Sequence, residues 1–133
     1  MSVYLAIVLS ILFLVFVYAA IKVIRNRRPY QKKDLVRVEE KNLNGNIVHV
    51  YHHISGVKNG DELFYYKDGI LNKQNHWVAN KLEGQSITYF ENGDKYIFAN
   101  YLKGLLHGDY IVYSTNKKII KTYIYENGNR VGG

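Results

Sequence analysis

Two different patterns of apolar and polar residues divide the chain. From Val3 to Ile21 there is no charge, and Ser10 is the only openly polar side chain. Beyond residue 42 the apolar residues come in short runs such as LFYY and SITYF, which are bounded by glycine. A long uncharged run is typical of a membrane-spanning helix, and short runs of β-branched and aromatic residues are typical of strands. The pattern predicts a transmembrane helix at 1–24, followed by a mainly-β region.

The apolar run has the length of a bilayer crossing. About 22 residues at about 1.5 Å each give roughly 33 Å, close to the thickness of the hydrocarbon core. Tyr4 and Tyr18 lie toward the two ends, where aromatic rings favour the interface. A cleaved signal peptide, ending at VYA in 17–19, is the alternative. A signal peptide would usually carry a cation before its apolar run, and this chain has no Lys or Arg there.

A basic segment follows the apolar run. The stretch from Lys22 to Lys41 has eight Lys and Arg residues against three acids, and Pro29 is expected to end the helix. Cations beside a span stay on the cytoplasmic side, which predicts a single-pass protein with a cytoplasmic body and a juxtamembrane linker at 25–41. These cations either set the topology alone or also contact anionic lipid head groups. The candidate membrane-surface residues are Arg25, Arg27, Arg28, Lys32 and Lys33.

The β region is an internal repeat with a period of 24 residues. Gly60, Gly84, Gly108 and Gly132 lie at this spacing, and aliphatic, tyrosine and further glycine positions recur with them. Stacked units of this length, each too small to bury its own apolar surface, are typical of repeat proteins. Lys117 and Asn80 depart from the pattern at two glycine positions. The glycines that define the repeat are Gly60, Gly69, Gly84, Gly93, Gly104, Gly108, Gly128 and Gly132.

Each unit is predicted to be a β-hairpin with a return turn. Asp68-Gly69 and Asn92-Gly93 are expected to form tight turns in which both residues have positive φ. Stacked hairpins then form a single-layer antiparallel sheet, because a lone hairpin is barely stable in water. Gly45 and Gly56 fit an earlier, degraded unit that would start at Val36. The expected repeat domain is 42–133, with a partial unit at 42–59 and full units at 60–83, 84–107 and 108–131.

One face of this sheet is expected to hold the core. In the second unit its members would be Leu63, Tyr65, Asn75 and Trp77, with equivalents 24 and 48 residues later. The rings either stack along the sheet as core or leave part of a face open to a peptide, a second copy or lipid. Rings at the alternate positions favour a binding surface. The candidate partner-binding residues are Tyr66, Phe90, Tyr96 and Phe98.

The chemistry-bearing residues indicate no enzyme, metal or cofactor. His49 and His53 would share a strand face but lie roughly 13 Å apart, too far for one metal, while His52 points to the other face. Asp61 and Glu62 flank a turn and are expected to be solvated. The chain has no Cys, which excludes disulfides and Cys-ligated metals. From residue 42 onward ten Lys and Arg residues oppose eight acids, too little positive charge for a nucleic-acid module.

The glycine, tyrosine and Asn-Gly spacing over about 45–133 resembles the MORN repeat in its bacterial form, and is similar to that of the YwqK-type antitoxin family. The resemblance implies a non-enzymatic, membrane-anchored module that binds proteins or acts as a scaffold. The alternative it implies is an immunity or antitoxin protein that neutralises one toxin by direct binding. An open edge at the last hairpin adds the expectation of a homo-oligomer.

Overall fold

The structure is a computed structural model that describes residues 3–26 and 34–133. The chain divides into two units, 1–32 and 33–133, which are described separately. The first contains one helix, α1 (Val3–Asn26). No helix in the described part of the chain is long and apolar enough to cross a membrane. The transmembrane segment therefore stays a prediction. Arg25 lies in the last turn of α1, whereas the cations at 27, 28, 32 and 33 lie outside the described residues.

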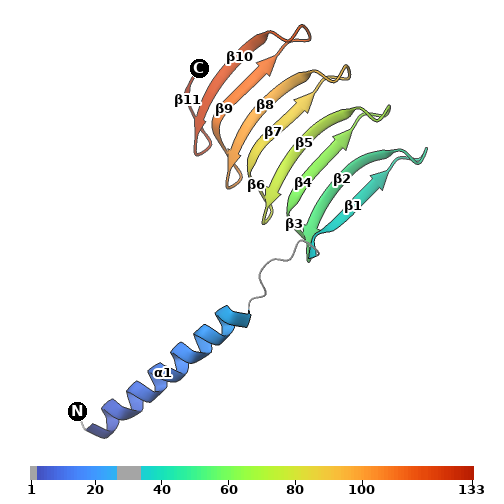
Figure 1. The fold of residues 1–133 in the computed structure, drawn as a ribbon. Helices are drawn as coiled ribbons and strands as arrows, with labels where there is room; N and C mark the ends of the chain where they lie inside the picture. Colours follow the sequence, from blue (N-terminus) through green and yellow to red (C-terminus); the bar gives the residue numbers. More distant parts are fainter. Residues whose placement is uncertain (1–2, 27–33) are drawn as a thin grey trace. The chain divides into compact units, whose positions relative to one another are not determined.

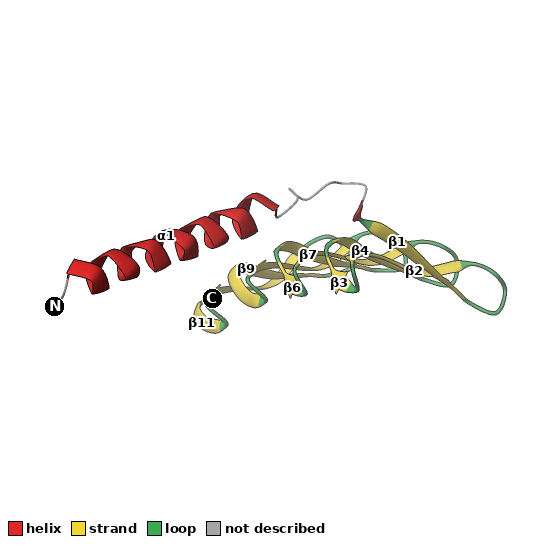
Figure 2. Ribbon diagram, turned by 90° about the horizontal axis from the view of Figure 1, so that it is seen from below, coloured by secondary structure: helices red, strands yellow, loops and turns green. Residues whose placement is uncertain are grey.

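The second unit is one mainly antiparallel β structure, as predicted. All its strands belong to a single 11-stranded sheet in which every pairing is antiparallel. Figure 1 shows the hairpins side by side in one row, and Figure 2 shows the same layer after a quarter turn. The strands are β1 (Val36–Lys41), β2 (Ile47–Ile54), β3 (Val57–Lys58), β4 (Gly60–Tyr65), β5 (Leu71–Val78), β6 (Lys81–Leu82), β7 (Gly84–Tyr89), β8 (Lys95–Leu102), β9 (Leu105–Tyr113), β10 (Ile119–Glu126) and β11 (Asn129–Gly132).

The 24-residue period is present in the strands themselves. The second strand of each hairpin, β2, β5, β8 or β10, has eight residues and starts at 47, 71, 95 or 119. The first hairpin is complete, because β1 pairs with β2 from Val36 to Lys41. The sheet thus begins at Val36, inside the stretch expected to be linker. The run VRVEEK has Glu39 and Lys41 where later units have an aliphatic residue and a tyrosine, and it forms the first strand of the degraded unit that was expected from Val36.

The two kinds of turn differ from the prediction. At the hairpin loops only the glycine has positive φ, for example Gly69 (86°) and Gly93 (83°), while Asp68 and Asn92 do not. Each loop that has this glycine closes with a bond from the glycine N–H to a carbonyl three residues earlier, for example 3.0 Å to Tyr66 and 2.9 Å to Phe90. Longer hairpin loops of this kind need one left-handed residue, not two.

Two consecutive left-handed residues occur instead at the return turns. These turns have only two residues between the strands, and their backbone twist requires positive φ at both. The pairs are Ser55-Gly56, Ala79-Asn80, Lys103-Gly104 and Asn127-Gly128. Neighbouring return turns are joined by backbone bonds: the N–H groups of Asn80, Gly104 and Gly128 donate to the carbonyls of Lys58, Leu82 and Leu106 at 3.0, 2.8 and 2.8 Å.

The predicted core face is wrong for the second strand of each hairpin. Leu63 pairs with Gln74, and Glu62 pairs with Asn75, so Leu63 and Asn75 lie on opposite faces. The register shifts between Phe64 and Tyr65, which adds one residue to the second strand and reverses its alternation. We call the two surfaces the Leu63 face and the Glu62 face. The Leu63 face includes Val50, Leu63, Gln74, Ile87, Phe98 and Ile111; the Glu62 face includes His49, Glu62, Asn75, Trp77, Ser86 and Ala99.

The repeat's exception at Lys117 gives a test of this turn geometry. Lys117 takes the place of the hairpin-loop glycine and has a φ of 65°. A side chain in this region costs about 1 kcal/mol, more than its exposed ion pair with Asp94 returns. We expect Lys117→Gly to raise the free energy of unfolding of the full-length protein by about 0.5–1 kcal/mol, measured by urea denaturation in detergent.

The matched control introduces a Cβ at a left-handed loop position that now has a glycine. Gly93 has a φ of 83°, and a Cβ there would have no heavy atom within 4 Å. Gly93→Ala should therefore lower the free energy of unfolding through backbone strain alone. Equal stability of Lys117→Gly and Lys117→Ala would contradict the turn assignment.

Candidate binding site around a buried carboxylate

The most unusual side chain in the sheet is the carboxylate of Glu62. It is 2% exposed, and with Val50 it is the largest fully buried side chain in the described residues. Glu62 lies in β4, between β2 and β5 in the sheet. Removing a carboxylate from water costs free energy unless it is paired and hydrogen-bonded. The groups around Glu62 must therefore offset this cost for the sheet to be stable.

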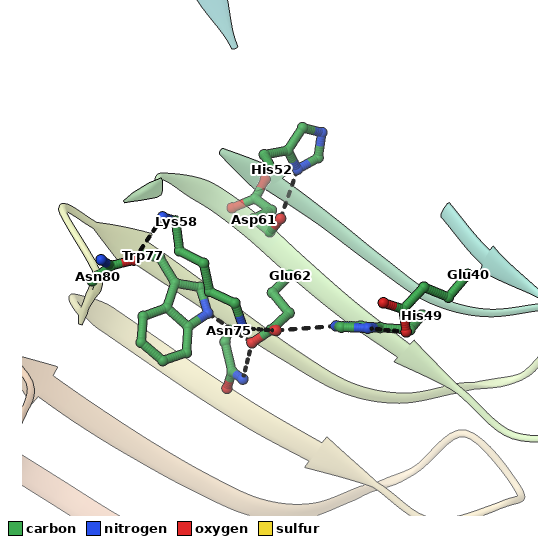
Figure 3. Close-up of polar contacts among 9 residues, drawn as sticks. All are labelled: Glu40, His49, His52, Lys58, Asp61, Glu62, Asn75, Trp77 and Asn80. Atoms are coloured by element: carbon green, nitrogen blue, oxygen red, sulfur yellow. Dashed lines mark hydrogen bonds and ion pairs between the residues drawn. The ribbon is translucent and has the colours of Figure 1, made fainter. Parts of the chain in front are cut away.

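Four side chains from three strands meet this carboxylate (Figure 3). Trp77 donates its indole N–H to Oε2 at 2.7 Å, and Asn75 donates its amide to the same oxygen at 3.1 Å. His49 Nε2 lies 3.0 Å from Oε1, and the Lys58 ammonium forms an ion pair with that oxygen. Both carboxylate oxygens are therefore satisfied from β2, β3 and β5.

This arrangement holds the carboxylate in its charged form. Burial by itself would raise the pKa of Glu62, but the hydrogen bonds from Lys58, Asn75, Trp77 and His49 outweigh it and lower the pKa to about 2. Bonds to the charged form of an acid favour that form. Glu62 is thus a fixed negative charge over the whole physiological range.

A second set of contacts positions these partners. His49 Nδ1 lies 3.0 Å from Glu40 Oε2, and its ring stacks on Phe64 with centroids 4.2 Å apart. The carbonyl oxygen of Asn75 accepts a bond of 2.7 Å from the Ser86 hydroxyl. The network thereby runs from β1 to β7, across the first three units.

The Lys58 ammonium also lies against two aromatic rings. It is 4.8 Å from the ring centroid of Trp77 and 5.7 Å from that of Tyr51. Both distances are within the range in which a ring face attracts a cation. The Lys58 side chain is 36% exposed, so this cation lies at the surface above the buried carboxylate.

The expectation that Asp61 and Glu62 are both solvated is half wrong. The Asp61 side chain is 68% exposed and its carboxylate accepts from His76 at 2.7 Å, but Glu62 points to the opposite face, where neighbouring side chains bury it. The available signal was the period: Glu62 stands where later units have Ser86 and Tyr110, and Lys58 where they have Leu82 and Leu106. A charge pair replacing such residues in one unit indicates a special site.

The predicted partner-binding residues are only partly brought together. Phe90 and Tyr96 pack with ring centroids 4.6 Å apart, and Tyr96 is 39% exposed. The Tyr66 hydroxyl instead donates to the Tyr89 carbonyl at 2.7 Å, which joins two units. Phe98 lies on the Leu63 face, where it pairs with Ile87 and Ile111.

The histidine cluster is distributed as the strand alternation predicts. His49 and His53 lie on the Glu62 face, and His52 lies on the opposite face, where its Nδ1 is 2.6 Å from the Asp61 carbonyl. Among the residues that the structure describes, no three His, Asp or Glu side chains are placed to hold a metal ion.

No family model matches this chain, and neither a curated protein nor a solved structure matches it significantly. The resemblance to MORN repeats consequently stays a hypothesis.

The buried carboxylate predicts a specific acid dependence of stability. The pKa of Glu62 is about 2 in the fold and about 4.5 when unfolded, so the folded state binds fewer protons between these values. The stabilisation is present above pH 4.5 and lost as the pH falls toward 2, by on the order of 3 kcal/mol. We expect Glu62→Gln to be less stable at pH 7 and to lack this loss, measured by urea denaturation followed by Trp77 fluorescence.

Asp61→Asn is the matched control, because it removes a neighbouring carboxylate that is mostly exposed. It should keep the acid dependence of the wild type. If Glu62→Gln kept it as well, the ion pair and hydrogen bonds around Glu62 would not stabilise the fold.

Proposed function

We propose that this chain is a non-enzymatic, membrane-anchored binding module built of MORN-like repeats. The observation that carries the proposal is the single layer of the sheet. Most domains hide their core between two layers, whereas here both faces bear side chains that are half-buried or exposed. Such a sheet offers a large, ordered surface to a partner.

The anchor is proposed from the uncharged sequence run Val3–Ile21, since no described helix is by itself long and apolar enough to cross a membrane. The side chains of Leu12, Phe13, Leu14, Phe16 and Tyr18 are 60–72% exposed, and successive residues point around the whole helix. A helix that is apolar on all sides needs an apolar environment. The basic residues at 25–33 favour a cytoplasmic position of the sheet.

The hairpin loops supply the surface best suited to a protein partner. Each loop, or the strand start beside it, carries an exposed apolar side chain, and all the loops lie at the same end of the sheet. These residues are Leu43, Ile70, Tyr96, Ile119 and Ile120. Exposed apolar and aromatic side chains with little net charge are typical of protein interfaces.

The non-enzymatic part of the proposal rests on how the titratable groups are used. Glu40, His49, Lys58 and Glu62 are bonded to one another across the strands. An acid or base in catalysis must instead reach a proton on a substrate.

The partner is tested by capture of the tagged full-length protein from gently solubilised native membranes, with bound proteins identified by mass spectrometry. We expect Phe90→Ala with Tyr96→Ala to lose the captured protein, because the exposed Tyr96 ring packs on the half-buried Phe90 ring beside the loop. Leu102→Ala with Leu105→Ala is the control, since it removes apolar residues of similar exposure from the return-turn end.

Each result has a distinct meaning. Capture of envelope proteins that depends on Phe90 and Tyr96 supports the binding module. A single stoichiometric partner with a toxic domain would make this an immunity protein instead. Capture that is insensitive to both pairs of substitutions would remove the loop surface from the proposal.

The anchor is tested separately, by alkaline extraction of membranes. We expect the wild type to stay in the membrane pellet, and Phe13→Arg with Leu14→Arg to move to the supernatant, because two charges near the centre of a span cost several kcal/mol. Thr122→Arg on the sheet adds charge without touching α1 and should stay in the pellet. Release of the wild type would contradict the anchor.

A further inference from the structure

We propose that Glu62, Trp77 and Tyr51 form a binding site for an ammonium or guanidinium group, which the chain's own Lys58 occupies and a basic side chain of a protein partner can enter in its place. That the entering group belongs to a protein partner rests on the proposed function. The binding site itself rests on contacts within the sheet.

The chemistry of the three residues is that of cation recognition. Glu62 supplies a buried charge, and Trp77 and Tyr51 supply two ring faces that lie 4.8 and 5.7 Å from the Lys58 nitrogen. A carboxylate below and ring faces beside a cation attract it through charge and through the ring quadrupoles. The bound ammonium of Lys58 shows that the space accepts such a group.

The other units show that the fold does not need this arrangement. The places of Lys58 and Glu62 are taken by Leu82 and Ser86 in the next unit. Leu106 and Tyr110 take these places in the unit after that. Arg130, three periods after Lys58, has its guanidinium 4.2 Å from the Tyr123 ring. A cation on a ring thus recurs, while a buried anion beneath it is confined to one unit.

The backbone of Lys58 is held independently of its side chain. Its backbone is held from both sides by Asn80, whose N–H donates to the Lys58 carbonyl at 3.0 Å and whose side-chain oxygen accepts from the Lys58 N–H at 2.7 Å. Departure of the ammonium from the site therefore needs only rotation of this flexible, partly exposed side chain. Glu62 would then be a buried charge without its ion pair, which is costly and favours entry of another cation.

The experiment uses the full-length protein in detergent and the fluorescence of Trp77, the only Trp in the chain. The variant Lys58→Ala vacates the site, and the probe is N-acetyl-lysine methylamide, with the norleucine analogue as an uncharged control. We expect a saturable change in Trp77 emission with the lysine probe in Lys58→Ala, at least tenfold weaker affinity in the wild type, and no response to norleucine.

Two further variants make the test specific. Lys58→Leu carries the residue of the next unit and fills the space, so it should not respond. Lys58→Ala with Glu62→Gln removes the anion and should lose at least tenfold in affinity. If Lys58→Ala loses its β-sheet circular dichroism, Lys58→Ser, whose side chain is also short enough to leave the space open, replaces it with the same expectations.

A folded Lys58→Ala protein that gives no saturable response, or one that responds equally with and without Glu62, would overturn the site. Probe binding without any captured partner would leave the site in place and overturn the proposed function. Partner capture without probe binding would overturn the cation site and leave the proposed function in place.

Discussion

The structure depends on the hydrogen bonding that joins one hairpin to the next. The second strand of each of the first three hairpins pairs with the first strand of the following unit, over a short stretch where His49 and Val50 meet Phe64 and Leu63 and over a longer one between β8 and β9. The return turns add a backbone bond between neighbouring units. Because there is no second layer in the described sheet, these bonds must fix the register that packing fixes in a globular domain. This explains why left-handed residues recur at the same positions of each unit. Each one allows the turn that places the following strand in its hydrogen-bonding register.

At the N-terminal end of the sheet, the Glu62 network adds side-chain bonds between units to the backbone bonds. The first three units are linked there by side chains, from Glu40 through His49 and Glu62 to Asn75 and Ser86, in addition to the backbone ladder. Every polar atom in such a network has to be satisfied, and within the described residues no buried side-chain polar atom lacks a partner. A complete network gives the sheet one arrangement, since a change of register would leave Glu62 buried and unpaired.

The sequence predicted the period and the antiparallel sheet, because Gly and Asn are among the few residues that tolerate positive φ and so mark the turns. It did not predict which face Asn75 and Trp77 would occupy. A single extra residue opposite Phe64 and Tyr65 reverses the alternation, and no residue type signals it. Glu62 was missed for a related reason: the neighbouring acids Asp61 and Glu62 look alike in sequence, and only strand alternation places one in solvent and the other beneath Trp77. The charged run of β1 shows that pairing can make a strand where composition does not favour one.

The equal length of the units also gives the sheet a spacing. Equivalent residues of successive units lie two strands apart, and adjacent strands are about 4.8 Å apart, so each loop follows the last by about 10 Å. Two turns of an α-helix or three residues of an extended chain cover nearly the same distance. The loops that bear Leu43, Ile70, Tyr96 and Ile119 therefore present apolar side chains at a regular spacing. A linear segment with one apolar side chain at every second helical turn could meet several loops at once, and an irregular surface could meet only one.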